Sequence, residues 1–378
     1  MPAPMTPRQR LLAALRREPV DTVPISPRIS AYLVTEKLTA LEAAAKFDFD
    51  PYREYRCLSE PLSDPYCQRL ALGDAQVEIA TAREGAKTTL RRTFRTPAGP
   101  LCDVLVQPDA GPVYGPSPNP EWTEPLVKSR EDAARLRYLL PDPAAADIAG
   151  WRRCEGEWGE RGLVIARPTN GADMVAITAL EVGRAMLLLH DDPALFDEAL
   201  RVADDWHIAV MKRVLEGGAR VIFDSFFHLS LSTGWSPDFY RERVAPLVRR
   251  HADLVQAYDG IYVFYDDGKI MRSIDMIASA GIDAMQTITP PPVGDADFRD
   301  LKRRYGDRIC FWGGVDLIRM KLGTPAEVER MTRAALDALA PGGGYILGTS
   351  DSIREGTPAE NIRAFCRTGR EWKAGGEA

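Results

Sequence analysis

The stretch Arg220-Val-Ile-Phe-Asp224 begins a pattern that recurs four more times before residue 352. Each repeat is a short β-branched or aromatic run that ends near an acidic or polar residue and is followed by an amphipathic segment. Runs this apolar are typical of strands buried on both faces of a parallel sheet. The pattern predicts a (β/α)8 TIM barrel, a fold whose chemistry lies at the carboxyl ends of its strands. The later runs are Gly260-Ile-Tyr-Val-Phe-Tyr-Asp266-Asp267-Gly268, Ile282-Asp-Ala-Met-Gln286-Thr287, Arg308-Ile-Cys-Phe-Trp-Gly-Gly-Val-Asp316 and Gly344-Tyr-Ile-Leu-Gly-Thr-Ser350-Asp351.

The segments between these runs support the same fold. Residues 239–258 and 325–339 carry apolar side chains at a spacing near 3.6, so strand and helix alternate as a parallel sheet requires. Capping boxes with proline at the first helical position predict helix starts at Thr6, Thr324 and Thr357. We therefore expect an N-terminal helical extension, followed by a first barrel strand at residues 22–26.

A proline-rich region, residues 48–145, interrupts the alternation and reads as irregular. Within it, alternating residues between 76 and 107 predict an antiparallel β-ribbon inserted into the barrel. The barrel resumes at Leu163-Val-Ile-Ala166, and a long helix is expected from Asp192 to about Glu216. Because barrels of this class often exceed 250 residues with insertions, we expect one domain spanning residues 1–378.

The composition is that of an ordinary globular protein, with 45% hydrophobic and 27% charged residues in a chain of 378. A net charge of −6 argues against nucleic-acid binding, which needs clustered Lys and Arg. The N-terminus has no signal-peptide pattern and the chain has no membrane-length apolar run, so we expect a cytoplasmic protein. The six cysteines are far apart and read mostly as buried hydrophobes. The oligomeric state stays open, with a homodimer among the alternatives.

Most standard catalytic strings are absent from the sequence. There is no GxGxxG after a strand, no Walker loop, no GxSxG elbow and no HExxH. What remains is a set of polar residues at the ends of predicted strands, which a barrel would bring to one mouth. The set comprises Arg28, Asn170, Asp224, His228, Tyr265, Asp266, Asp267, Gln286, Asp316 and Asp351.

Four members of this set are candidates for proton transfer or for stabilising charge. Asp224 ends an apolar run, where burial and neighbouring carboxylates raise a carboxyl pKa; the alternative is that it caps the following loop. Asp266 and Asp267 are adjacent, so strand alternation sends only one into the mouth, with Asp267 weakly favoured. His228 is the one histidine that follows a barrel strand. Tyr265 completes these candidates.

The remaining residues are candidates for binding. Arg28 could clamp a carboxylate or phosphate bidentately, or simply be a solvated surface arginine. Asp316 follows two glycines that allow a close backbone approach to a ligand, but it could equally anchor its loop. Asn170, Gln286 and Asp351 are further candidates for contacting substrate. The acids together with His228 could hold a hard or borderline metal, but their spacing is not specific and we predict none.

Several segments, taken in order over nearly the whole chain, resemble the uroporphyrinogen decarboxylase-like superfamily. That superfamily also contains corrinoid-dependent methyltransferases. Most of these segments are structural signatures, so the fold follows from them more directly than the chemistry. The segments begin Thr6-Pro-Arg-Gln-Arg-Leu-Leu, Asp21-Thr-Val-Pro24, Ser236-Pro-Asp-Phe-Tyr240, Leu301-Lys-Arg-Arg-Tyr-Gly-Asp-Arg-Ile-Cys-Phe-Trp-Gly-Gly-Val-Asp316, Gly323-Thr-Pro-Ala-Glu-Val328, Pro341-Gly-Gly-Gly-Tyr-Ile-Leu347 and Thr357-Pro-Ala-Glu-Asn-Ile362.

Two departures from the family pattern narrow what the resemblance implies. Uroporphyrinogen decarboxylases grip their substrate's carboxylates with an arginine-rich RQAGR motif, where this chain keeps only Arg28. Many corrinoid methyltransferases of this superfamily bind zinc through His-x-Cys and a later Cys. Here those places read Phe264-Tyr-Asp266-Asp267 and Thr349-Ser350-Asp351, so zinc activation of a thiol is not expected.

The resemblance therefore implies a zinc-independent methyltransferase that moves a methyl group between a corrinoid and a small substrate. The substrate would be a methylated ether or amine, or tetrahydrofolate. The chain has no DxHxxG string for binding cobalamin, so the corrinoid is expected on a partner protein docked over the barrel mouth. Two alternatives stay open: a decarboxylase or carbon–carbon lyase acting on a smaller acid, and a non-catalytic barrel that serves as a binding subunit.

Overall fold

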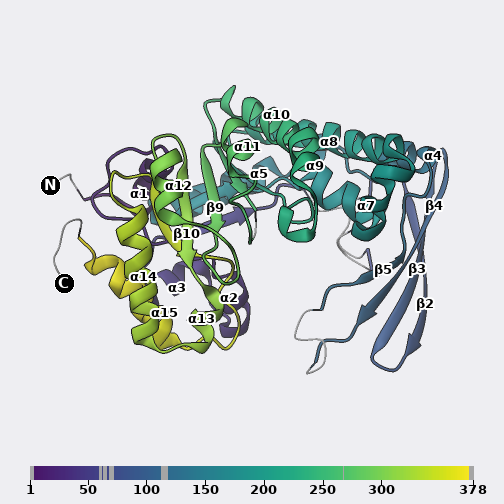
Figure 1. The fold of residues 1–378 in the computed structure, drawn as a ribbon. Coiled ribbons are helices and arrows are strands. Elements are labelled where there is room, and N and C mark those ends of the chain that lie inside the picture. Colours follow the sequence, from purple (N-terminus) through teal and green to yellow (C-terminus); the bar gives the residue numbers. More distant parts are fainter. Residues whose placement is uncertain are drawn as a thin grey trace. The chain divides into compact units, whose positions relative to one another are not determined.

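The computed structural model describes residues 4–58, 62, 66–67, 72–111, 118–266 and 268–373. The chain divides into two compact units (Figure 1). The first comprises Met1–Tyr55, Ile148–Arg167 and Gly218–Ala378, and the second comprises Arg56–Asp147 and Pro168–Gly217. The second unit is thus made of two chain segments that leave the first unit and return to it. No helix in the described residues has both the length and the apolar character of a membrane span.

The first unit is built on a curled sheet of seven parallel strands. The strands lie in chain order, so each crossover places the next strand beside the last, as in a TIM barrel. The predicted runs from residue 163 onward are all strands. The sheet order is β1 (Tyr52–Tyr55), β6 (Leu163–Ala166), β7 (Val221–Ser225), β8 (Ile261–Tyr265), β9 (Ala284–Ile288), β10 (Cys310–Val315) and β11 (Tyr345–Thr349).

A short extended segment at residues 24–26 occupies the place of the eighth strand. Ile25 forms a parallel bridge with Leu347 of β11, and the amide of Ser26 donates to the carbonyl of Leu347 at 2.7 Å. On its other side, the carbonyl of Ile25 accepts from the amide of Asp50, which lies just before β1, at 2.6 Å. The first barrel strand predicted at residues 22–26 therefore joins the two ends of the sheet.

Helices cover the outside of this sheet, as Figure 1 shows for α12 and α14 beside β10. Capping boxes start α1 at Thr6 and α14 at Thr324, as predicted. The third predicted cap is wrong: α15 begins at Ala359, and the Thr357 hydroxyl donates to the Arg354 carbonyl instead. The helices are α1 (Pro7–Leu15), α2 (Ser30–Glu36), α3 (Ala40–Phe47), α5 (Ile148–Trp158), α9 (Pro237–Phe239), α10 (Ala245–Gln256), α11 (Ile274–Ser279), α12 (Phe298–Tyr305), α13 (Leu317–Leu322), α14 (Pro325–Leu339) and α15 (Ala359–Glu371).

The barrel interior is a single apolar cluster formed by alternate residues of the strands. It includes Phe223 of β7, Val263 and Tyr265 of β8, and Trp312 of β10, and α1 adds Leu11. Because side chains alternate across a strand, the residues between these members point outward to the helices. This alternation decides which polar side chains reach the inside of the barrel.

The second unit contains the predicted ribbon. Strand β3 pairs antiparallel with β2 and β4, and β5 adds a fourth strand, so the ribbon is a small sheet. Arg92 and Asp103, both fully buried, form an ion pair across β3 and β4. The predicted long helix is α8. The elements are β2 (Gln76–Glu84), β3 (Lys87–Thr96), β4 (Gly99–Pro108), β5 (Glu121–Glu124), α4 (Arg130–Arg135), α6 (Ile177–Leu180), α7 (Val182–Asp191) and α8 (Pro193–Glu216).

Candidate active site at the barrel mouth

A cavity of about 770 Å³ lies at the carboxyl ends of β7 to β11. All of its lining residues belong to the first unit, and they come from the loops that follow five successive strands. This size lies within the range of pockets that hold small molecules. The residues that line it are Leu231, Ser232, Gly268, Lys269, Thr289, Val293, Asp316, Leu317, Ile318, Lys321, Leu322, Ser350, Asp351 and Arg354.

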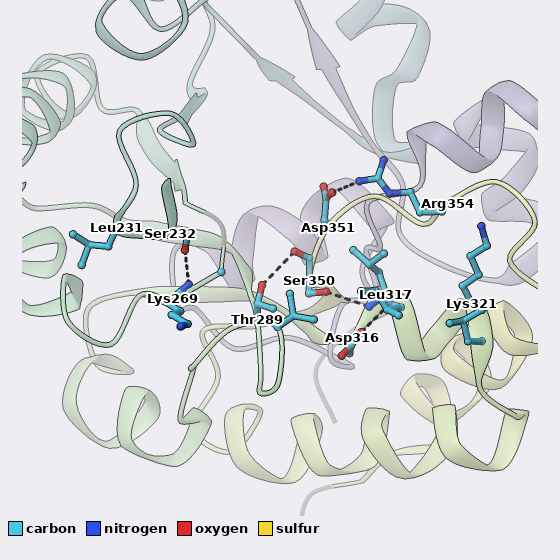
Figure 2. Close-up of a pocket in the computed structure, with 14 residues that line it drawn as sticks. Leu231, Ser232, Lys269, Thr289, Asp316, Leu317, Lys321, Ser350, Asp351 and Arg354 are labelled. Atoms are coloured by element: carbon cyan, nitrogen blue, oxygen red, sulfur yellow. Dashed lines mark hydrogen bonds and ion pairs between the residues drawn. The ribbon is translucent and has the colours of Figure 1, made fainter. Parts of the chain in front are cut away.

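The cavity combines an apolar rim with charged groups (Figure 2). Leu322 is 77% exposed, and Ile318 and Val293 are close to half exposed. The Ser232 hydroxyl accepts from the amide of Lys269 at 2.8 Å, which ties the loop after β7 to the loop after β8. Hydrogen bonds also join the loops after β9, β10 and β11, so several loops hold one another in place around the cavity.

Inside the barrel, two arginines flank one carboxylate. Nη1 of Arg28 lies 3.3 Å from Glu54, and Nη1 of Arg167 lies 2.7 Å from the other oxygen of the same group. Both guanidinium groups lie over the Phe223 ring, at 5.4 and 5.3 Å from its centre. The Arg28 group also lies 5.0 Å from the centre of the Tyr265 ring. Cations over aromatic faces are attracted by the ring quadrupole, so both arginines are held by charge and by packing.

Asp351 links this inner cluster to the cavity. Its carboxylate lies 3.8 Å from Arg28 and 3.1 Å from Arg354, and the residue lines the cavity wall. Burial is the largest single effect on Arg28 and disfavours its charged form, but the interactions with Glu54, Tyr52, Tyr265 and Asp351 together outweigh burial and raise the pKa of Arg28 above its ordinary value. Arg28 therefore carries a permanent positive charge inside the barrel, where the low dielectric strengthens its field.

Tyr52 and Gln286 complete the inner wall. The Gln286 amide donates to the Tyr52 hydroxyl at 3.2 Å, and the Tyr52 ring packs edge-on against Trp312. Burial raises the pKa of the Tyr52 hydroxyl, so that it keeps its proton at neutral pH and can donate a hydrogen bond. The Gln286 carbonyl oxygen is buried with no hydrogen-bond partner among the described residues. The inner wall therefore contains buried donors and a buried acceptor, and Asp351 connects it to the cavity.

The structure brings five of the predicted residues into this region. Arg28, Tyr265 and Gln286 lie inside the barrel, and Asp316 and Asp351 line the cavity at its mouth. Asp316 also caps α13, because its carboxylate accepts from the amides of Ile318 and Arg319. Asp316 therefore both lines the cavity and anchors its own loop, so the two interpretations of this residue are compatible.

The expectation that the Asp224 carboxylate faces the barrel mouth is wrong. Phe223 occupies the inward position of β7, so Asp224 points outward beneath α10 and is fully buried. One of its oxygens accepts from Nδ1 of His251 at 2.8 Å and from the hydroxyl of Tyr262 at 2.7 Å. The sequence placed Asp224 at the strand end, but β7 continues to Ser225. The group is therefore part of the packing between the sheet and the helices.

We expect Asp224→Asn to reduce stability rather than the turnover of folded protein. Replacing the charged acceptor by an amide weakens two buried hydrogen bonds and should lower the free energy of unfolding by about 1–3 kcal/mol. Denaturant titration followed by circular dichroism measures this loss. Turnover reduced more than tenfold per folded molecule, with an unchanged unfolding midpoint, would instead support the catalytic role predicted from sequence.

Two further predicted residues are placed differently, and a third is not described. His228 lies in the loop after β7, half-buried, and its carbonyl accepts from the Trp235 indole at 2.6 Å. It does not line the described cavity, and its catalytic role stays a prediction. Asn170 belongs to the second unit, where its side chain accepts from the amide of Asp173 at 2.8 Å. Asp267 lies outside the described residues.

The sequence interpretation missed Tyr52, Glu54 and Arg167. Tyr52 and Glu54 lie on β1, in the region predicted to be irregular, although Tyr52-Arg-Glu-Tyr55 has the alternation of a short strand. Arg167 directly follows the apolar strand β6, so the rule that selected the other residues at strand ends would also have selected it.

Among the described residues, the positions that were compared with a zinc motif in the sequence offer oxygen donors and neither a thiolate nor an imidazole. The inward side chain of β8 is Tyr265, and the corresponding positions after β11 are Ser350 and Asp351. The Asp351 carboxylate already pairs with Arg28 and Arg354. A soft thiolate site for zinc does not fit these residues.

The chain is similar to known proteins in both sequence and structure. The family model described as uroporphyrinogen decarboxylase (URO-D) matches residues 112–372, which is more than half of the chain. A uroporphyrinogen decarboxylase from Thioalkalivibrio sulfidiphilus is 25% identical, covering 94% of this chain and 95% of the relative. A methylated-thiol–coenzyme M methyltransferase from Methanosarcina mazei is 27% identical, covering 98% of this chain and 91% of the relative.

A solved structure supports the fold. A methyltransferase from Methanosarcina mazei superposes with a TM-score of 0.64, covering 97% of this chain and 99% of that one, at 17% identity. At this identity the likeness concerns the fold alone. This chain covers nearly the full length of the two sequence relatives. They are enzymes of two kinds, a decarboxylase and a methyltransferase.

Proposed function

We propose that this chain, which belongs to the uroporphyrinogen decarboxylase (URO-D) family, is a corrinoid-dependent methyltransferase. It would move a methyl group between a corrinoid carried by a partner protein and a small substrate. The substrate would be a methylated ether or amine, or tetrahydrofolate. The near full-length similarity to a methyltransferase supports this reaction class.

The observation that carries the proposal is the two-layered mouth of the barrel. A cavity of about 770 Å³ has an apolar, exposed rim, and Asp351 in its wall pairs with the buried Arg28. A small substrate fits the cavity, and the rim remains for a second reactant that arrives from outside. A tetrapyrrole with many carboxylates would need several arginines. The loop that carries them in decarboxylases supplies Arg28 alone here.

A corrinoid on a partner protein is compatible with the rim. Leu322, Ile318 and Val293 expose apolar surface around the cavity, and exposed apolar patches of this kind are typical of interaction sites. When bound, a corrinoid supplies a cobalt centre that takes up or gives up the methyl group. The residues of this chain would bind the substrate, orient its methyl group toward the rim and exclude water.

The inner wall is suited to stabilising a leaving group. When an ether loses its methyl group, negative charge develops on its oxygen, and a fixed cation in a dry site lowers the barrier to that step. Arg28 provides such a charge, and Tyr52 keeps a proton that can be hydrogen bonded to the same oxygen. The Tyr265 ring lies beneath Arg28, and Tyr265 stays a candidate for proton transfer or for stabilising charge. None of these roles requires zinc.

A decarboxylase acting on a smaller carboxylic acid is the second candidate. Two buried arginines beside Tyr52 could hold a carboxylate, and uroporphyrinogen decarboxylases are among the sequence relatives. Such an enzyme would release carbon dioxide and would not need a corrinoid.

An isotope experiment separates the two candidates. Purified protein is incubated with donors that carry a carbon-13 methyl group and with acids labelled in the carboxyl carbon, each with and without cobalamin. We expect the methyl label to leave its donor only when cobalamin is present, with no labelled carbon dioxide from any acid. Labelled carbon dioxide formed without cobalamin would reject the methyltransferase proposal and support the decarboxylase.

A further inference from the structure

Strand β2 is a long edge of the small sheet in the second unit (Figure 1). The strand order is β2-β3-β4-β5, so β2 pairs with β3 on one side and has no strand on the other side among the described residues. It spans nine residues, most of them exposed, whereas a typical strand has about five or six. Its outer backbone groups make no hydrogen bond to another described segment. An unpaired edge of this length is a template for a further strand.

The usual devices that protect an edge strand are missing from β2. Its register with β3 runs without a bulge from end to end, and it contains neither proline nor lysine. Two of its charged side chains are neutralised by residues of the same unit. Glu78 pairs with Arg95 of β3 at 2.9 Å, and Arg83 pairs with Asp109 at 2.5 Å. These charges therefore repel an approaching strand only weakly.

The hairpin geometry shows which backbone groups face outward. Strands β2 and β3 are joined by the two-residue turn Gly85-Ala86, and Glu84 and Lys87 are the closing pair. The closing pair of such a hairpin exchanges hydrogen bonds, and bonded and non-bonded pairs then alternate along the strands. Every second residue of β2 therefore directs its amide and carbonyl away from β3. These residues are Val77, Ile79, Thr81 and Arg83. Three of the four are β-branched, the class that favours strands.

We propose that β2 pairs antiparallel with β2 of a second copy of this chain, so that two small sheets join into one. The pairing is centred on Ala80, the middle residue of the strand. Ile79 then lies opposite Thr81 of the second copy, and Glu78 lies opposite Ala82. The outward residues meet one another in this register, which gives about eight new backbone hydrogen bonds. The inference does not depend on the proposed reaction.

The sequence of β2 fits itself in this register better than in the neighbouring ones. Opposed side chains must lie on the same face of the sheet, so a two-fold axis passes through a residue. An axis at Thr81 sets Glu78 opposite Glu84, and like charges directly opposite are destabilising. An axis at Ile79 leaves the last two residues of β2 unpaired. Only the axis at Ala80 pairs the whole strand, and it places no like charges opposite each other. This self-complementarity favours a second copy over an unrelated segment.

The mass of the full-length protein in solution tests the inference first. We expect sedimentation equilibrium at micromolar concentrations to show a dimer. Ile79→Pro should raise the dimer dissociation constant at least about 100-fold, because proline blocks an outward donor without removing a bond to β3. Ala80→Lys should raise it at least about tenfold, because it sets two positive charges side by side at the axis. Circular dichroism shows whether each variant is folded.

A pair of cysteine variants tests the register. Ala80 and Ala82 are both exposed and lie on the same face of β2. In the proposed dimer, Ala80→Cys brings two Cβ atoms to about 4.5–5.5 Å, close to the span of a disulfide. Ala82→Cys is the matched control, because its two copies lie about 13 Å apart. We expect mild oxidation to cross-link Ala80→Cys at least about tenfold faster than Ala82→Cys. The unmodified protein, with its six native cysteines, gives the background rate.

Three results would overturn the inference. A monomeric unmodified protein would exclude self-pairing and leave the edge to an extended segment of another protein. A dimer that persists in both folded variants, Ile79→Pro and Ala80→Lys, would place its interface elsewhere. Equal cross-linking of Ala80→Cys and Ala82→Cys would reject the register centred on Ala80.

Discussion

Arg28→Gln is expected to lower kcat/KM for methyl transfer by at least about 100-fold, because it removes the fixed cation that faces the leaving group. Charges in a dry site act strongly on the transition state, and Arg28 is buried over Tyr265 and Phe223. Initial rates with a donor that the unmodified enzyme accepts measure the change. The melting temperature, recorded in parallel, shows whether the variant is folded.

Two comparisons sharpen this prediction. Arg28→Lys keeps the charge but loses the planar fork and its packing on the rings, so an intermediate loss of roughly tenfold is expected. Arg354→Gln, at the half-exposed rim of the cavity, should cost less than tenfold, because water screens its charge. A kcat/KM for Arg28→Gln within threefold of the unmodified value, in a folded protein, would show that the buried guanidinium has no part in the reaction.

The largest loss of stability is expected from Asp50→Asn. Asp50 is fully buried at the start of β1, and its carboxylate accepts from the Ile25 amide at 2.9 Å and from Arg370 at 3.1 Å. It also binds Arg10 of α1. Removing its charge leaves Arg10 with Asp21 alone and Arg370 with the exposed Asp48 alone, so we expect a loss of about 3 kcal/mol in the free energy of unfolding. Denaturant titration of the variant gives this value.

Asp48→Asn provides a control two residues away. The Asp48 side chain is 78% exposed and pairs with Arg370 at 3.3 Å. Exposed ion pairs contribute at most about 1 kcal/mol, and asparagine tolerates the left-handed backbone at this position. Similar losses in the two variants would contradict the role of Asp50 in joining α1, the first strand and α15.

The parts of the barrel that the sequence predicts well are the strands buried on both faces. Burial requires apolar side chains in both directions, so β7 to β11 stand out as continuous runs. Strand β1 lacks this signal because two of its side chains are polar and contact other polar groups inside the barrel. Its residues Tyr52 and Glu54 contact the polar site, so the strand reads Tyr-Arg-Glu-Tyr and resembles a loop.

The site was harder to predict because alternation and register are not visible in a run of apolar residues. Phe223 takes the inward position of β7, so the next residue, Asp224, points to the outer face of the sheet, where it meets His251. The partners of Arg28 could not be foreseen either, since Glu54 and Asp351 are distant from it in sequence and from each other. The fold brings these residues together.

We propose that methyl transfer to a corrinoid proceeds in this barrel without zinc. Its most direct test follows the absorbance of reduced cobalamin mixed with the purified protein and a panel of methylated acids, ethers and amines, with and without a chelator. We predict methylation of the corrinoid with at least one donor, at the same initial rate in the presence of chelator. The account is contradicted if no donor reacts, or if chelator stops the reaction and added zinc restores it.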